Sequence, residues 1–295
     1  MKFSSFKQID YSMMSSYMGR WATFFVFFFI ILLAVGSILI KEEDVAHSSV
    51  SIGISAFDSL RAYSTFNAFS DFLRSRGCGE VEWKYFQHGD KPSGCDLYFI
   101  SVLQAKEYLK SGEMECVLIV APERARKYSR GIVITERSMT ALDSDSCLSV
   151  IVSSPIFNSN INVLEELEKD WLNRHLCNSG VEFADNFFND EKVYYAVIFG
   201  RYELGILREE RYRWFVSRGL IDTNLVKVLD KGNPVIDVIV TRDKWSDRRK
   251  VSRFMDRFLV VCEEMPETLR ERLRSVGICD FILPRQLDIE TLKKN

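Results

Sequence analysis

The chain has 295 residues, of which 47% are hydrophobic and 27% are charged, and its formal net charge is −2. This length allows one or two domains with a sizeable core, and the lack of a basic excess argues against nucleic acid as a partner. The seven cysteines include no CxxC pair and no zinc-type spacing, so neither a metal site nor a cofactor is expected.

The first element is a run of 20 residues without a charge, from Trp21 to Ile40, which reads WATFFVFFFIILLAVGSILI. About 20 apolar residues are what a helix needs to cross the hydrocarbon core of a membrane. The run is longer than the apolar region of a typical signal peptide, and no clear A-x-A cleavage site follows it. The sequence therefore predicts a retained transmembrane helix over 21–40, and a cleaved signal peptide is the alternative.

The charges around this run predict its orientation. Basic residues precede it at positions 2, 7 and 20, and acidic residues follow it at positions 42 to 44. Positive flanks tend to stay in the cytoplasm. We therefore expect a single-pass protein of the inner membrane, with a cytoplasmic tail over 1–20 and a periplasmic domain over 45–295.

The residues that follow alternate between strand and helix patterns. Strand patterns have runs of β-branched and aromatic residues, and helix patterns repeat apolar residues every three to four positions. In the first half, strands are expected at 49–55, 80–87, 96–101 and 115–122, with helices at 59–76 and 102–112. Strands that alternate with helices are typical of a parallel α/β sheet.

The second half has the same style. A strand is expected at 148–153 and a helix at 161–176. Apolar segments follow at 193–199 and 203–207, and the second of these is a strand. The remaining elements are a helix at 209–218, a strand at 235–243, a helix at 245–262, and one more short helix and a tail over 266–292. The pattern predicts two α/β lobes, between which the chain passes near 121–133 and again near 235–262. A cleft between two such lobes is a common ligand site.

Four stretches carry a resemblance to a known family. In chain order they read SIGISAFDSLRAYSTFNAFSDFL, CDLYFISVLQAKEYL, SVIVSSPIFNSNINVLEEL and ELGILREERYRWFVSRGLIDTNLVKVLDKGNPVIDVIVTRD. Their order and spacing over about 48–262 resemble the PhnD-type periplasmic phosphonate/phosphite-binding proteins, within the type II periplasmic-binding fold. The resemblance implies an α/β, two-lobed periplasmic-binding-protein-like fold, here preceded by one N-terminal transmembrane helix.

The resemblance also implies where a ligand would bind. In that family, backbone N–H groups and hydroxyls at the start of the second-lobe helix hold the phosphonate oxygens, as helix N-termini do with anions. The positions that match the ligand-facing loops are Phe57, Asp58, Ser101, Ser154, Asn158, Ser159, Asn160, Asn189, Asp190 and Arg208. Arg208 is the candidate for a bidentate anion clamp. The alternative is that the Ser, Asn and Asp residues cap helices and that Arg208 forms a surface salt bridge.

Two features depart from the family pattern. The turn over 153–160 keeps hydroxyl and amide donors but has no glycine, and it carries the bulky pair Ile156-Phe157. The helix that the family has between its second and third strands is replaced by HGDKPSG.

Two functions are therefore carried forward. The first is a membrane-anchored, solute-binding-protein-like domain that binds a small phosphonate- or phosphate-like anion for transport or sensing. The alternative is a degenerate binding fold that acts as a structural or accessory subunit of a membrane complex with an integral-membrane partner. An open polar cleft would favour the first function, and a cleft filled by Ile156 and Phe157 would favour the second.

Catalysis and disulfides receive weaker support. The three histidines, His47, His88 and His175, stand in no catalytic motif, and no nucleophile elbow, P-loop or HExxH is present, so no enzyme activity is expected. In a periplasmic domain the closest cysteine pairs, 78 with 95 and 262 with 279, are the candidates for disulfides. Cys116 lies in the apolar run ECVLIV and is expected in the core.

Overall fold

The computed structural model describes residues 49–55, 59–86, 90–139, 148–154, 157–170, 176–184 and 190–294. The predicted tail over 1–20 and the predicted membrane helix over 21–40 lie outside these residues, as do Phe57, Asp58, Ile156 and Asn189. Within the described ranges no helix is both long and apolar enough to cross a membrane. The membrane anchor and its orientation therefore remain predictions.

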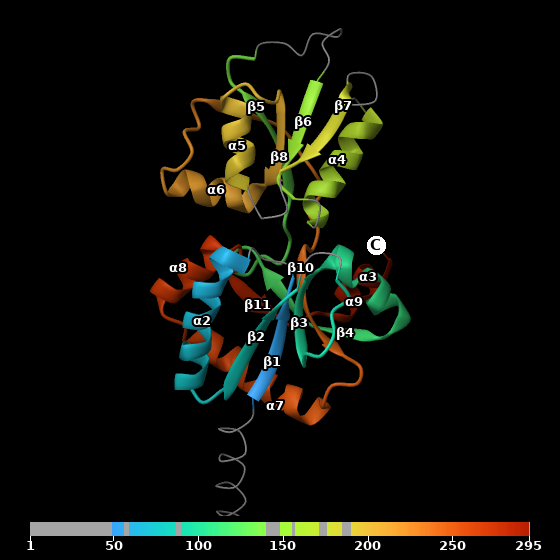
Figure 1. Cartoon of the computed structure of the whole chain (residues 1–295), viewed down its shortest axis with the longest axis vertical. Coiled ribbons are helices and arrows are strands. Elements are labelled where there is room, and N and C mark those ends of the chain that lie inside the picture. Colours follow the sequence, from blue (N-terminus) through green and yellow to red (C-terminus); the bar gives the residue numbers. More distant parts are fainter. Residues whose placement is uncertain are drawn as a thin grey trace, which may run out of the picture. The chain divides into compact units, whose positions relative to one another are not determined.

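The first sheet has the strand order β11-β4-β10-β3-β1-β2 (Figure 1). Its strands are β1 (Ser49–Ile54), β2 (Glu80–Tyr85), β3 (Leu97–Ser101), β4 (Met114–Ala121), β10 (Val238–Asp243) and β11 (Asp280–Ile282). β1 runs parallel to β2 and β3, whereas β10 runs antiparallel to β3 and β4. The sheet is mixed rather than parallel as predicted, because β10 re-enters it from the second sheet in the opposite direction.

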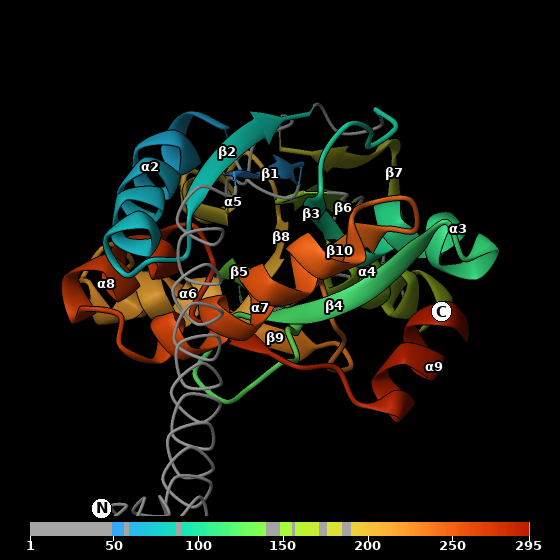
Figure 2. The ribbon, with the colours of Figure 1, turned by 90° about the horizontal axis from the view of Figure 1, so that it is seen from below.

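Helices cover both faces of the first sheet (Figures 1 and 2). One face packs against α2 (Ser59–Ser75), α7 (Arg248–Glu263) and α8 (Glu267–Ser275), and the other packs against α3 (Val102–Ser111) and α9 (Gln286–Lys294). The strands alternate accordingly: Leu97 and Phe99 lie in the first core, and Tyr98 and Ile100 lie in the second. Cys116 is buried in the second core, as predicted.

The second sheet has the order β7-β6-β8-β5-β9. Its strands are β5 (Gly131–Glu136), β6 (Leu148–Val152), β7 (Leu176–Phe183), β8 (Leu204–Arg208) and β9 (Val226–Lys231). α5 (Asp190–Ile198) and α6 (Glu209–Ser217) contribute to the core on one face, and α4 (Asn158–Asp170) contributes to the core on the other. We call the first sheet with its helices the first lobe, and the second sheet with its helices the second lobe.

The chain crosses from the first sheet to the second through residues 122–130 and returns through residues 232–237. The two crossing segments bond to each other, because Ser129 N–H donates to the Val235 carbonyl over 2.7 Å and Val235 N–H donates to the Ser129 carbonyl over 2.8 Å. These paired segments bring the end of β8 and the starts of α4 and α6 close to Asp237, the residue before β10.

Two predictions about elements are wrong, and the structure assigns one segment that the sequence left open. The helix predicted over 161–176 begins at Asn158 and ends at Asp170, and Leu176 starts β7, which pairs with β6. The segment 193–199, whose type the sequence left open, lies in helix α5 up to Ile198, because Val193, Tyr194 and Val197 share one buried face. The terminal segment 266–292 holds α8, β11 and most of α9 instead of one helix and a tail.

The candidate disulfides are not formed. Cys78, Cys95, Cys262 and Cys279 are all free thiols. Cys78 lies in the core on one face of the first sheet and Cys95 in the core on the other face, so the sheet itself stands between them.

Candidate functional site

The start of α4 is bonded to a carboxylate from the same chain. The backbone N–H of Ser159 donates to Oδ1 of Asp237 over 2.7 Å, and the Ser159 hydroxyl donates to Oδ2 over 2.6 Å. The first N–H groups of a helix have no partner inside it, and the helix dipole favours a negative charge there. Asp237 is only 6% exposed. It therefore occupies, from inside the protein, the type of position in which a helix N-terminus binds an anion.

A glycine allows α4 to approach the second sheet this closely. A Cβ atom on Gly131, the first residue of β5, would lie 2.4 Å from the Ser159 carbonyl oxygen and 2.7 Å from a Val163 methyl group. Any side chain at position 131 would push the start of α4 away from β5. The Ser159–Asp237 pair thus depends on a missing side chain in the adjacent strand.

Arg208, at the end of β8, lies in the same buried region and is 3% exposed. Its Nη2 donates to Oδ2 of Asp190 over 2.9 Å, and its Nε lies 4.0 Å from Oε1 of Glu210. Its guanidinium carbon lies 3.7 Å from the centre of the Phe157 ring. Phe157 is 1% exposed and belongs to the core on the α2 side of the first sheet. The guanidinium of Arg208 is therefore held by an acid and an aromatic ring.

The charges of this cluster are set by burial and by mutual contact. Burial raises the pKa of Asp237, and the Ser159 bonds and the charge of Arg208 only partly offset this effect. Burial likewise raises the pKa of Glu210 to about 7, although Arg208 and the Ser129 hydroxyl, which donates to Glu210 over 2.7 Å, act against it. Burial alone would lower the pKa of Arg208, but the nearby acids Asp190, Glu210 and Asp237 raise it.

The cluster is thus neutralised without a ligand. Arg208 and Arg211 face three acidic side chains, since Arg211 Nε also lies 3.6 Å from Oδ2 of Asp190. Buried charges are stable when they are paired and hydrogen-bonded. An added anion would therefore meet a site whose positive charge is already compensated by residues of the chain.

The structure brings some predicted site residues together and gives others a local role. Ser159, Asp190 and Arg208 belong to the buried cluster described above. Ser101 is the N-cap of α3, accepting a bond from Gln104 N–H over 3.1 Å, and the next residue of the chain, Val102, donates its N–H to the Asp237 carbonyl over 2.8 Å. Ser101 is thus beside the cluster as a helix cap, which is the alternative considered for it.

The remaining predicted residues surround the start of α4. Asn160 is buried and donates through its amide to the Ser153 hydroxyl over 2.8 Å and to the Ser154 carbonyl over 3.2 Å. These bonds close the turn that precedes the helix. Asn158 is half-buried and begins α4. Ligand binding by any of these residues remains a proposal.

The prediction from sequence missed Asp237, Glu210 and Ser129. A signal for Asp237 was present, because it is the one charged residue in the apolar run VIDVIV. Aspartate is almost never fully buried unless it has a partner. An acid in such a run therefore indicates a buried pair, although the sequence does not say with which residue.

Comparison with known proteins supports the fold. No known protein family and no curated protein matches the sequence. Solved structures do match: a Xanthomonas citri protein bound to ATP (TM-score 0.62, 11% identity, 84% of this chain and 96% of that chain), and the binding protein component of a phosphonate ABC transporter from Pseudomonas aeruginosa (TM-score 0.62, 12% identity, 84% and 85%). PhnD1 from Prochlorococcus marinus in complex with methylphosphonate also matches (TM-score 0.60, 12% identity, 83% and 96%).

These similarities confirm the two-lobed solute-binding fold that the four sequence stretches predicted. At 11 to 12% identity they concern the fold alone. The ligands of the similar proteins are therefore not transferred to this chain by the comparison.

Proposed function

We propose that this chain is a domain of the solute-binding fold that serves as an accessory subunit of a membrane protein complex, rather than as a receptor that closes around phosphonate. The observation that carries the proposal is the pair of hydrogen bonds from Ser159 to Asp237 at 2.7 and 2.6 Å. The place where the resemblance puts a phosphonate holds a carboxylate of the chain itself.

Competition makes this arrangement unfavourable for a ligand. Asp237 is tethered next to the α4 N-terminus, so its effective concentration there is high, of the millimolar order typical of short linkers. A free anion must displace it, and its apparent affinity falls by the fraction of molecules in which Asp237 has left. Displacement would also leave Asp237 buried without its two donors, which is costly for a carboxylate.

Phe157 gives the second line of support. A side chain this large replaces the glycine-containing turn of the family, and its ring packs between the first-lobe core and the Arg208 guanidinium. A phosphonate-binding turn needs open space in front of its N–H groups, whereas here the bulky side chain of the turn is buried. The burial of Phe157 supports the accessory-subunit hypothesis, which expects a cleft filled by Ile156 and Phe157.

In this proposal the helix over 21–40 anchors the domain to the inner membrane and reaches an integral-membrane partner. The domain carries no catalytic role. The bonds of Ser159 to Asp237 would hold the lobes in one arrangement in this proposal, which suits a scaffold better than a carrier that must open and close.

Binding of a small anion for transport or sensing is the second candidate. It is favoured by the fold, which is shared with a phosphonate transporter component and with a methylphosphonate complex. It is also favoured by the Ser159 donors, since an N–H and a hydroxyl that hold two carboxylate oxygens are a suitable pair for two phosphonate oxygens. In this case Asp237 would move out when the ligand binds.

Thermal unfolding of the full-length protein in detergent separates the two candidates. The panel contains methylphosphonate, phosphate, phosphite, sulfate and acetate at constant ionic strength, and the matched variant is Ser159→Ala. A ligand at about 100 times its dissociation constant adds about 2.7 kcal/mol to the free energy of unfolding. We expect no shift that depends on Ser159. A shift that Ser159→Ala abolishes would overturn the accessory-subunit proposal and establish binding at α4.

A further inference from the structure

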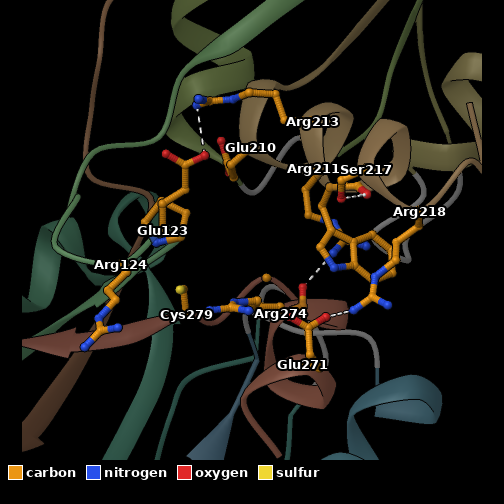
Figure 3. A pocket seen from close by; sticks show the side chains of 13 residues that line it. Glu123, Arg124, Glu210, Arg211, Arg213, Ser217, Arg218, Glu271, Arg274 and Cys279 are labelled. Carbon is orange, nitrogen blue, oxygen red and sulfur yellow. Dashed lines mark hydrogen bonds and ion pairs between the residues drawn. The ribbon is translucent and has the colours of Figure 1, made fainter. Parts of the chain in front are cut away.

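A different polar cavity, of about 520 Å³, lies beside the crossing segment 122–130 (Figure 3). Its walls come mainly from α6 in the second lobe and from α8 and the residues after it in the first lobe. Arginines dominate the lining: Arg124, Arg211, Arg213, Arg218 and Arg274. Ligand pockets commonly have volumes of about 300–1,000 Å³, so the cavity has room for more than a single inorganic ion.

The acids of the cavity do not match its arginines in number. Three glutamates line it against five arginines, and two of these acids are shared between partners. Acids outside the lining also pair with three of the arginines: Asp190 with Arg211, Glu209 with Arg213 and Glu267 with Arg274. Glu123 lies 3.0 Å from Arg213 and also 3.3 Å from Arg126 outside the lining, and Glu271 pairs with both Arg218 and Arg274. Shared carboxylates leave guanidinium N–H groups without a full partner, because each guanidinium has five donors.

Two further groups of the lining have no partner among the described residues. Arg124 is exposed and forms no ion pair with any residue that the structure describes, and its guanidinium points away from the other lining side chains (Figure 3). Trp214 also lines the cavity, and its indole Nε1, although buried, has no hydrogen-bond partner in the described part of the chain. The third glutamate of the lining, Glu210, has its carboxylate directed to the Ser129 hydroxyl at 2.7 Å. The lining therefore has more arginines than acids and offers many N–H donors.

We propose that this cavity binds an organic phosphate. Guanidinium groups bind phosphate bidentately and are weakly hydrated, so several of them around one cavity favour this class of anion. The volume beyond a single phosphate leaves room for the organic part. The cavity shares Arg211 and Glu210 with the buried cluster, but Ser159 and Asp237 do not line it, and the proposal does not rest on the accessory function proposed above.

The bound anion would join elements of the two lobes. Arg218, directly after α6, already pairs with Glu271 of α8, and Arg211 Nη1 donates to the Arg274 carbonyl over 2.8 Å. A phosphate held by arginines from both helices adds further bonds across the same boundary. Ligand binding at this site would therefore stabilise one arrangement of the lobes.

Cys279 provides a direct readout because it lines the cavity as a half-buried free thiol, whereas Cys78, Cys95, Cys116 and Cys262 are buried. The full-length protein in detergent is treated with iodoacetamide, and alkylation of the Cys279 peptide is followed by mass spectrometry. The probes are phosphate, pyrophosphate and phenyl phosphate, with potassium chloride at matched ionic strength as control. We expect the phosphates, and not chloride, to slow the alkylation of Cys279.

Three variants locate the effect. Arg218→Gln should raise the phosphate concentration needed for half of the full protection by at least about tenfold, because it removes one charge-assisted pair. Glu123→Gln should strengthen it severalfold, because it removes a competing carboxylate, and such a gain cannot come from misfolding. Arg248→Gln, an exposed arginine of α7 outside the cavity, should change nothing.

The possible results are distinguishable. Protection that is weaker in Arg218→Gln, stronger in Glu123→Gln and intact in Ser159→Ala supports a phosphate site in this cavity. Absence of protection by any of the three phosphates, or equal protection by chloride, overturns it. Protection that Arg248→Gln weakens as much as Arg218→Gln would also overturn it, since only general charge attraction would then be at work.

Discussion

Replacing Asp237 by alanine tests the centre of the proposed function. The variant loses two hydrogen bonds from Ser159 to a charged group, each worth about 1.5–3 kcal/mol. It also loses the favourable charge at the α4 N-terminus and leaves Arg208 with one acid fewer nearby. Because removal of one member of a buried charged network typically costs about 3–5 kcal/mol, we expect a loss of that size. A domain of this length should then unfold roughly 10 °C lower.

The same variant should acquire a ligand that the wild type lacks. Without the Asp237 carboxylate, the N–H and hydroxyl of Ser159 face vacated space, and a small free anion can take up both bonds. Acetate or methylphosphonate should therefore raise the melting temperature of Asp237→Ala, by an amount equivalent to about 2.7 kcal/mol near 100 times the dissociation constant. Differential scanning fluorimetry of full-length protein in detergent measures this rescue.

Asp288→Ala is the matched control. Asp288 is also a buried acid, ion-paired with Lys127 and accepting the N–H of Arg285 over 2.9 Å before α9, but it lies outside the α4 cluster. Its loss should destabilise the protein without producing rescue by acetate. If Asp237→Ala is as stable as the wild type, or if anions rescue neither variant, the reasoning that Asp237 fills an anion position is refuted.

Further predictions concern pH, packing and the membrane. Burial raises the pKa of Glu210 from 4.5 to about 7, so the folded protein binds this proton more tightly than the unfolded chain. The free energy of unfolding should therefore fall by up to about 3 kcal/mol as pH rises through this range. Urea titrations at pH 5 and 8 should show a smaller fall in Glu210→Gln than in the wild type. An equal fall in the two proteins would show that Glu210 is not the titrating group. Phe157→Ala should cost about 3–5 kcal/mol in the same assay because it empties a core position, and a cost below about 1 kcal/mol would show that the ring is dispensable. Gly131→Ala should lower the melting temperature, because its Cβ would lie 2.4 Å from the Ser159 carbonyl oxygen, and a stable variant would show that α4 can shift freely. Full-length protein should stay in the membrane on carbonate washing if 21–40 is a retained span, whereas release of a shortened chain would indicate a cleaved signal.

Much of the fold was predictable because strand and helix periods are local. The alternation of apolar runs located β1, α2, β3, α3 and β4 nearly at their observed bounds. Local periods did not decide every segment. The sequence left the type of VYYAVIF open because it is rich in β-branched and aromatic residues, and packing on the second sheet places all but its last residue in helix α5. LCNSGVEF lacks a clear alternation, and only its pairing with β6 makes it a strand.

The candidate site, like the fold, was predicted from the sequence only in part. The sequence drew attention to Ser159, Asp190 and Arg208 through a resemblance, and the structure gathers these three residues in one buried cluster. What the sequence did not provide is the partner of each group. Asp190 precedes Arg208 by 18 positions and their pairing needs α5 to lie against the end of β8. The aromatic ring of Phe157 reaches Arg208 only because the lobes meet at that turn.

From the sequence alone came the two-lobed α/β fold, the expected membrane span and the existence, though not the bounds, of the helix that starts the second lobe. These features follow from hydrophobic periods and lengths, which are properties of neighbouring residues. The tertiary structure alone decided what stands in front of that helix. Ser159 and Asp237 are 78 positions apart, and their contact depends on the return of the chain from the second sheet into β10. A buried helix end bonds with whichever group the fold brings to it, and here the fold brings a carboxylate of the same chain.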